Sequence, residues 1–563
     1  MKIYLTKSFS VLLTLLCSIF LIHNISYPQN ITEEWVARFN HTSDDKAHQI
    51  VIDNIGNVYV VGESDASPNG YTDYVTLKYN NNGVLQWARF YDGLPNNQNY
   101  DRARSVTVDI SGNCYVTGYS NSIPFPYGDN LDVVTIKYDT AGNTIWTHRF
   151  DAGLTDGGDI IKIDNSGNIV VAGTSMLLQT LQDFIILKYD PNGTLLWAKR
   201  FDYANNRDYV RSMVIDNQNN IYVTGVFSAT ANADYGTIKY NSSGDFLWVA
   251  VYDGPTSYSV DESNDIAVDN FGNVYVTGQS WGGSTWTDIV TVKYDSSGNE
   301  LWVARYNGNP GTYGLHDKGI GVVVDDSGFA YVTGWSSVID DADIVLIKYD
   351  QRGDTVWTRR YNGPGNSYDF PYDITLDRNG NVYIAGYSFG TSDNADYIVL
   401  KYNPEGLLIW ADRYNGPGNG TDVASSIVVD SKDNVYVTGW SRSSGNLDIA
   451  TIKYSQNTTS VQNISAEVSD NFFLFQNYPN PFNPNTKIKF TVPLVESHRD
   501  ASQLVTLKVY DVPGNEVAAL VNEQLPAGEY EVGFDASGLA SGVYFYKLQG
   551  GEFISSKKLL LMK

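Results

Sequence analysis

The residues best able to do chemistry are aspartates that recur at a fixed position along the chain. One stands 17 residues before the glycine that ends each of eight Tyr/Val-rich segments: Asp45, Asp101, Asp156, Asp208, Asp261, Asp317, Asp369 and Asp422. Calcium prefers oxygen ligands, so these carboxylates could bind Ca²⁺ or a cationic ligand. Aspartate also caps turns by accepting backbone N–H bonds between strands. Repetition in every copy favours this architectural role, because a single active site would break the symmetry.

A second arrangement couples aspartate to tryptophan and arginine. An aspartate precedes a tryptophan by 14 residues in seven copies: Asp73, Asp132, Asp183, Asp234, Asp288, Asp343 and Asp396. In the last copy the same pattern wraps from Asp448 to Trp35 near the start of the chain. Arginine mostly occupies the position three residues after the tryptophan: Arg38, Arg149, Arg200, Arg305, Arg360 and Arg413. We interpret these arginines as structural because they repeat.

Aromatic residues in segments that depart from the repeat are candidates for ligand binding. They are Tyr127 within 120–130, Trp281 and Trp286 within SWGGSTW, and Tyr313 within 307–318. Exposed aromatic rings in such segments suit stacking on sugar rings, and they equally suit packing of the loop itself.

No coherent catalytic set is found in the sequence. Gly386–Gly390 fits the G-x-S-x-G pattern of a nucleophile elbow, but that motif needs a strand-to-helix turn. A serine two residues after the glycine occurs in seven of the eight copies, so it belongs to the repeat. Cys114 is the only cysteine outside residues 1–29. An intrachain disulfide and cysteine-rich zinc sites in the rest of the chain are therefore excluded.

The repeated aspartates, tryptophans and arginines belong to a sequence repeat of about 54 residues, which determines where they lie in the fold. Its second strand ends at Gly62, Gly118, Gly173, Gly225, Gly278, Gly334, Gly386 and Gly439. Each copy has four segments of alternating apolar and polar residues separated by D-x-x-G-N turns, which predicts four antiparallel strands. The eighth copy lacks its Trp-bearing strand, and the segment around Trp35 supplies it. We therefore predict an all-β, closed eight-bladed β-propeller over residues 30–455 whose N-terminal strand completes the last blade.

The repeats resemble the bacterial β-propeller repeats called SBBP repeats. The resemblance rests on D-x-x-G-N-x-Y-V-x-G and on the hairpin K-Y-D-x-x-G-x-x-x-W, and it covers about three quarters of the chain. It implies a propeller but brings no established catalytic residues with it.

The last part of the chain differs in character. Residues 456–470 read as a polar linker, and residues 471–563 predict a small Ig-like β-sandwich from several short alternating strands. The sequences FLFQNYPNPFNPNTKIKF (473–490) and GLASGVYFYKL (538–548), with the terminal KKLLLMK, resemble the type A C-terminal sorting domain of type IX secretion. This resemblance implies that residues 471–563 engage the type IX secretion machinery.

The net charge of the chain and its N-terminal segment limit the classes of partner that we expect. With 38 basic and 63 acidic residues the formal net charge is −25, which opposes binding to nucleic acid or to anionic lipid. Residues 1–29 read as a signal peptide, with Lys2 and Lys7 before the apolar run 11–22. That run is too short to span a bilayer comfortably. We expect a secreted or surface-located monomer without a transmembrane anchor.

The sequence favours a protein that binds an extracellular polysaccharide or protein through variable loops on one face of a rigid propeller. One alternative is an enzyme on a propeller scaffold, either a carbohydrate lyase or hydrolase or a protein resembling quinone-dependent dehydrogenases. Another is a structural surface-layer component. No cofactor is required by the sequence; calcium is the one that the repeated aspartates could take.

Overall fold

The fold consists of β-strands. The structure is a computed structural model that describes residues 31–65, 71–93, 100–122, 130–177, 181–229, 232–256, 259–283, 286–309, 314–339, 341–391, 394–443, 445–456, 462–465, 471–494, 503–536, 539–551 and 553–563. Over these residues it contains strands and turns but no helix. The prediction of an all-β chain of four-stranded antiparallel sheets is confirmed.

Residues 31–456, in their described parts, form eight such sheets. Seven contain four consecutive strands: β2 (Asp45–Ile52), β3 (Val58–Asp65), β4 (Thr72–Tyr79), β5 (Leu85–Tyr91); β6 (Asp101–Val108), β7 (Cys114–Asn121), β8 (Leu131–Tyr138), β9 (Thr144–Phe150); β10 (Thr155–Ile163), β11 (Ile169–Met176), β12 (Gln182–Tyr189), β13 (Leu195–Phe201); β14 (Asp208–Ile215), β15 (Ile221–Ala229), β16 (Asn232–Tyr240), β17 (Phe246–Tyr252); β18 (Asp261–Val268), β19 (Val274–Trp281), β20 (Thr287–Tyr294), β21 (Glu300–Tyr306); β22 (Asp317–Val324), β23 (Ala330–Val338), β24 (Asp341–Tyr349), β25 (Thr355–Tyr361); β26 (Asp369–Leu376), β27 (Val382–Phe389), β28 (Ala395–Tyr402), β29 (Leu408–Tyr414). The eighth has the order β1-β32-β31-β30, from β1 (Ile31–Phe39), β30 (Asp422–Val429), β31 (Val435–Arg442) and β32 (Leu447–Gln456).

The turns of the repeat are held by an aspartate and a glycine. In the turn between β6 and β7, the Asp109 carboxylate accepts backbone N–H bonds from Ser111 and Asn113, both at 2.9 Å. Gly112 has a φ of 82°, which an L side chain rarely adopts. The D-x-x-G-N signature therefore specifies a tight connection that fixes the strand register.

The glycine that ends each second strand faces an irregularity in the first strand. Between β18 and β19 the register shifts between Ser263 and Asp265, which leaves Asn264 as an extra residue. A Cβ on Gly278 would lie 2.0 Å from the carbonyl oxygen of Glu262, so only glycine fits. The same shift occurs in all eight first strands, within the part that the structure describes. Such a bulge bends the strand and changes the direction of side chains.

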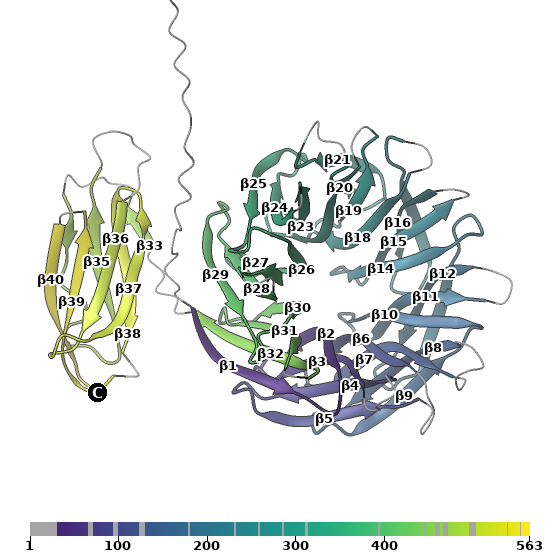
Figure 1. Cartoon of the computed structure of the whole chain (residues 1–563), viewed down its shortest axis with the longest axis horizontal. Helices are drawn as coiled ribbons and strands as arrows, with labels where there is room; N and C mark the ends of the chain where they lie inside the picture. The colour runs from purple at the N-terminus through teal and green to yellow at the C-terminus, as the bar shows by residue number, and fades with distance from the viewer. Residues whose placement is uncertain are drawn as a thin grey trace, which may run out of the picture.

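The eight sheets are arranged around a common centre, with the first strand of each nearest to it (Figure 1). Successive first strands contact one another, including β2 with β30. Hydrophobic clusters lie between neighbouring sheets, and one of them joins Tyr436 and Ile449 of the last sheet to Val58 and Val60 of the first. Strand β1 pairs antiparallel with β32, from Ile31 opposite Gln456 to Phe39 opposite Ile449.

The repeated tryptophans pack between sheets. Trp87 on β5 donates its indole N–H to the Thr140 carbonyl of the next sheet at 3.1 Å. Lys78 on the adjacent strand donates to the same carbonyl at 3.0 Å. The Trp35 indole makes the equivalent bond to the Asn81 carbonyl of the first sheet. These rings are therefore part of the inter-sheet packing.

Residues 462–563 form two further four-stranded antiparallel sheets over their described range. Their orders are β33-β38-β35-β34 and β37-β36-β39-β40, from β33 (Gln462–Ser465), β34 (Phe473–Leu474), β35 (Asn485–Val492), β36 (Gln503–Tyr510), β37 (Glu516–Leu525), β38 (Gly528–Asp535), β39 (Gly542–Gly550) and β40 (Phe553–Leu561). Both sheets contribute to one core that includes Ile488, Phe490, Leu507 and Leu548. The Asn-Pro-rich motif ties into this core: the Tyr546 hydroxyl donates to the Phe475 carbonyl at 2.8 Å.

Part of the segment between the two groups of sheets is a strand. Within the expected linker 456–470, Gln462–Ser465 form β33 and pair with β38, so that segment is not all linker. Backbone pairing to an existing strand edge does not require the side-chain alternation on which the prediction relied. The predicted signal peptide, residues 1–29, lies outside the described residues, as do Tyr127 and Tyr313.

Candidate functional site

The eight aspartates that open the first strands are buried and act as caps. Each accepts a backbone N–H from the loop before its own strand, at 2.6–3.0 Å. Gly254 N–H, for example, donates to the Asp261 carboxylate at 2.9 Å, and Trp281 N–H donates to its other oxygen at 3.0 Å. In each sheet the carboxylate thereby stabilises the loop that arrives from the preceding sheet.

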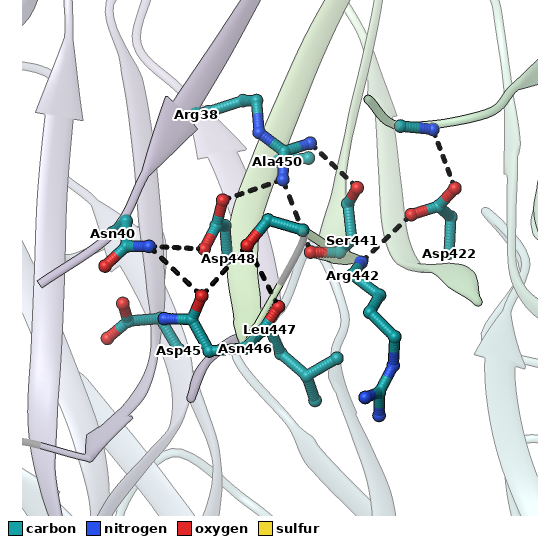
Figure 2. Close-up of polar contacts among 12 residues, drawn as sticks. Arg38, Asn40, Asp45, Asp422, Ser441, Arg442, Asn446, Leu447, Asp448 and Ala450 are labelled. Atoms are coloured by element: carbon teal, nitrogen blue, oxygen red, sulfur yellow. Dashed lines mark hydrogen bonds and ion pairs between the residues drawn. The ribbon is translucent and has the colours of Figure 1, made fainter. Parts of the chain in front are cut away.

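Six of the eight aspartates that open the third strands form ion pairs with the repeated arginines. The pairs are Arg38–Asp448, Arg149–Asp132, Arg200–Asp183, Arg305–Asp288, Arg360–Asp343 and Arg413–Asp396. Figure 2 shows the first of these, where Arg38 on β1 donates to Asp448 on β32 and to the Ser441 hydroxyl on β31, both at 2.7 Å. The repeated arginines therefore tie three strands of a sheet together.

This contact also accounts for the serine of the G-x-S-x-G motif. Ser388 is fully buried, and its hydroxyl accepts a hydrogen bond from Arg413. The equivalent Ser120 and Ser280 accept from Arg149 and Arg305, both at 2.7 Å. These serines share one repeated structural contact.

Carboxylates gather where the loops meet the sheets. Over the described residues, four groups have oxygens within 4.8 Å of one another: Asp73, Asp92, Asp101; Asp132, Asp151, Asp156; Asp183, Asp202, Asp208; and Asp234, Asp253, Asp261. The second and third groups contain an arginine-paired aspartate. In the first and fourth groups Phe90 and Val251 stand where the arginine would be. These two groups are the ones whose donor sets best suit a hard cation.

In these two groups the aspartate that opens the third strand has a raised pKa. Burial, together with the neighbouring Asp92 and Asp101, raises the pKa of Asp73 to about 7. Burial, together with Asp253 and Asp261, raises the pKa of Asp234 to about 6. Because the folded-state pKa lies above the unfolded value near 3.9, the stability contribution of each group falls as pH rises from about 4 to 7.

We therefore expect Asp73→Asn and Asp234→Asn each to raise the melting temperature at pH 8 in EDTA, by about 2–4 °C, and to leave it unchanged at pH 4. Asp295→Asn is the matched control: hydrogen bonds within its turn lower the pKa of Asp295, so no gain follows. Thermal unfolding at both pH values measures the difference. A melting temperature that falls only in calcium-containing buffer would instead make these groups cation ligands.

Two of the aromatic candidates from the sequence lie together. The Trp281 and Trp286 rings are 5.6 Å apart between centroids, and Trp286 meets the His316 ring edge-on at 4.5 Å. Thr287 and the Nδ1 of His316 are 3.0 Å apart. Both tryptophans are partly exposed: Trp281 is the last residue of β19 and Trp286 directly precedes β20, at the end of the sheet where the first strands begin.

A larger aromatic group, absent from the sequence candidates, lies on β23, β26 and β27 and on the residue before β26, at the same ends of the strands. We call it the aromatic cluster: Trp335, Tyr368, Phe370, Tyr372, Tyr387 and Phe389. Phe370 is its centre, with ring centroids 5.2 Å from Trp335 and 5.4 Å from Tyr387. Tyr368 and Tyr372 are 44% and 51% exposed, so both side chains are accessible to a ligand.

The cluster breaks the repeat. Phe370 follows the aspartate that begins its first strand; five of the other seven sheets have a charged residue or glycine there, one has Val423 and one has Tyr209. Tyr372 is the extra residue of its bulge, between Pro371 and Asp373 in the register. A comparison of the eight copies at one and three residues after the aspartate that opens the first strand could have found these positions. The residue type varies there, while the aspartate itself is repeated in every copy.

Comparison with known families matches both parts of the chain. Five segments match the Beta-propeller repeat family SBBP: residues 94–126, 196–226, 254–284, 356–392 and 409–447. Residues 476–562 match the Secretion system C-terminal sorting domain.

Individual relatives are distant. A curated protein described as Uncharacterized WD repeat-containing protein L264, from Acanthamoeba polyphaga mimivirus, is 24% identical over 449 residues, 65% of this chain. This chain spans 30% of that relative's length.

The similar solved structures are also distant. One is a protein of unknown function from Dyadobacter fermentans, with TM-score 0.37 and 10% identity, covering 76% of this chain and 100% of that one. Another is the polysaccharide lyase Uly1, with TM-score 0.39 and 11% identity, covering 65% and 93%. A third is the α-L-arabinofuranosidase Arb93A from Fusarium graminearum, with TM-score 0.35 and 9% identity, covering 52% and 91%. At these TM-scores the likenesses assign no function.

The sorting-domain match implies export, with the protein secreted or held at the cell surface. Over the described residues no helix is long and apolar enough to cross a membrane. The chain thus contains SBBP-type beta-propeller repeats and a C-terminal sorting domain of type IX secretion.

Proposed function

We propose that residues 30–455 are a closed eight-bladed β-propeller, and that residues 471–563 are an Ig-like sandwich that engages the type IX secretion machinery. The pairing of β1 with β32 and the packing of Tyr436 against Val58 support closure. In a closed propeller the unpaired strand edges are only the short outer ones of the separate sheets, which suits a monomer outside the cell.

We propose further that the exported propeller binds an extracellular polysaccharide. The observation that carries this proposal is the aromatic cluster around Phe370, whose outer rings Tyr368 and Tyr372 are exposed. Exposed aromatic faces stack on the C–H faces of sugar rings, and a cluster that occurs in one sector breaks the symmetry as a ligand site must. Trp281 and Trp286 supply a second contact at the same edge.

The repeated aspartates have an architectural role in this proposal. The eight that open the first strands hold loops through backbone N–H bonds, so polysaccharide binding is expected to persist in EDTA. A loss of binding in EDTA would assign calcium to the ligand site.

The test is binding of the purified full-length protein to a panel of neutral and acidic polysaccharides, measured by affinity electrophoresis, with reducing-end release assayed in parallel. We expect retardation by at least one polysaccharide without product release. Tyr372→Ala and Phe370→Ala should weaken that retardation at least about tenfold, the loss typical of a central aromatic contact.

The matched control is Phe271→Ala, which removes a 76% exposed ring from a turn at the opposite sheet edge and should leave retardation unchanged. Equal retardation of all three variants would contradict the assignment of the site. Product release would make the protein a carbohydrate-active enzyme, and failure to bind any polysaccharide would contradict the proposed function.

A further inference from the structure

Two exposed arginines lie on first strands, the strands nearest to the centre of the ring (Figure 1). Arg104 and Arg211 are the extra residues in the bulges of β6 and β14, and both side chains are exposed. Among the described residues, neither has a hydrogen bond or a carboxylate within 4.0 Å of its guanidinium, whereas the six repeated arginines all pair with aspartate.

These arginines flank one carboxylate. Asp159 occupies the corresponding place on β10, between them around the ring. Burial raises the pKa of Asp159 to about 6, although both guanidiniums act to lower it. One carboxylate between two guanidiniums leaves a net positive charge on the surface that β6, β10 and β14 form near the centre of the ring.

A third cation extends the positive surface toward the aromatic cluster. Burial lowers the pKa of Lys318 on β22, and the charge of Arg211 adds to this lowering while Glu262 opposes it. Arg211 and Lys318 lie on first strands, β14 and β22, that both pack against β18. The repulsion between Arg211 and Lys318 is local, and an anionic ligand bound between them would relieve it.

The cations and the aromatic rings are contiguous. Lys318 is the direct cross-strand neighbour of Trp335 in the register of β22 and β23. Side chains paired in this way lie on the same face of a sheet with Cβ atoms about 5 Å apart. Trp335 in turn contacts Phe370, so the surface runs from Arg104 and Arg211 through Lys318 to the cluster.

We infer that the ligand is a carboxylated polysaccharide, a polyuronate, whose sugar rings stack on the aromatic cluster while its carboxylates meet Arg104, Arg211 and Lys318. Guanidinium groups bind carboxylates through two parallel hydrogen bonds, which gives both charge and direction. This inference rests on the proposed function and specifies its substrate class.

The test compares oligogalacturonate with its carboxyl-reduced form, which has the same backbone without charge. Calorimetric titration of the full-length protein should give at least about tenfold tighter binding of the acidic form at low salt, and the preference should shrink as salt rises. A sulfated galactan oligosaccharide forms a third arm, and it should bind more weakly than the carboxylated one if carboxylate geometry matters.

Arg104→Gln and Arg211→Gln should each weaken the binding of oligogalacturonate by about tenfold, because one charge-assisted contact is lost. The binding of the carboxyl-reduced form should not change. Arg378→Gln removes an exposed arginine from a turn at the opposite sheet edge and is the matched control. Phe370→Ala should weaken both arms. Arg211→Lys keeps the charge and serves if the glutamine variant is unstable.

Equal binding of acidic and reduced oligosaccharides would overturn this inference and leave the proposed function standing. If Arg104→Gln, Arg211→Gln and Arg378→Gln lost equal affinity for oligogalacturonate, the assignment of the carboxylate site to Arg104 and Arg211 would be wrong. Tighter binding of the sulfated than of the carboxylated form would overturn the assignment to carboxylate. Binding of none of the oligosaccharides would overturn both proposals.

Discussion

A variant that begins at residue 40 is expected to lose the cooperative unfolding of the propeller, with a melting temperature at least about 10 °C below that of a variant that begins at residue 30. Strand β1 is the outer strand of the last sheet, and its removal exposes the full edge of β32. It also removes Arg38 from Asp448, which leaves a buried carboxylate without its cation. Differential scanning calorimetry measures the effect.

Addition of a peptide with the sequence of residues 31–39 should recover part of the lost stability, because the same strand can pair in trans. Equal melting temperatures for the two variants would mean that β1 contributes nothing to closure, and the closed-ring proposal would fail.

The second large effect is expected from Gly278→Ala. The added Cβ would lie 2.0 Å from the Glu262 carbonyl oxygen and 2.8 Å from the Cα of Ser263, both of them backbone atoms of the bulged strand. Backbone cannot move aside as a flexible side chain can, so strand β18 must shift. The cost is expected to be about 3 kcal/mol in free energy of unfolding, at the upper end for overpacking.

Gly445→Ala is the matched control, because a Cβ there meets no atom within 4 Å. Chemical denaturation of the two variants gives the comparison. If Gly278→Ala were as stable as Gly445→Ala, the explanation of the repeated glycine by the bulge would be wrong.

The sheets could be predicted from the sequence because their determinants are local and repeated. The Asp109 turn and the Trp87 strand each occur within a few residues, and eight copies separate them from chance. The arginines were likewise identified as structural from repetition alone, and each lies against a third-strand aspartate. The order β33-β38-β35-β34 could not be predicted, since it depends on pairings between distant segments without a repeat.

The aromatic cluster and the three cations were missed for a physical reason. Trp335 and Phe370 are 35 positions apart, and Arg104 and Arg211 come from sheets that are not adjacent in the chain. The packing of separate sheets against one another brings such positions together. Within one repeat they look like tolerated variation at solvent-facing places, while the conspicuous aspartates beside them maintain the fold.

The most direct test of polysaccharide binding at the aromatic cluster is hydroxyl-radical footprinting of the full-length protein, with and without the polysaccharide that it binds most tightly. Oxidation of each aromatic side chain is read by mass spectrometry. Tyr368 and Tyr372, at 44% and 51% exposure, should be protected by the ligand, while Phe271, at 76%, should oxidise equally in both samples. Unchanged oxidation of both tyrosines in a sample shown to be saturated with ligand would contradict the account.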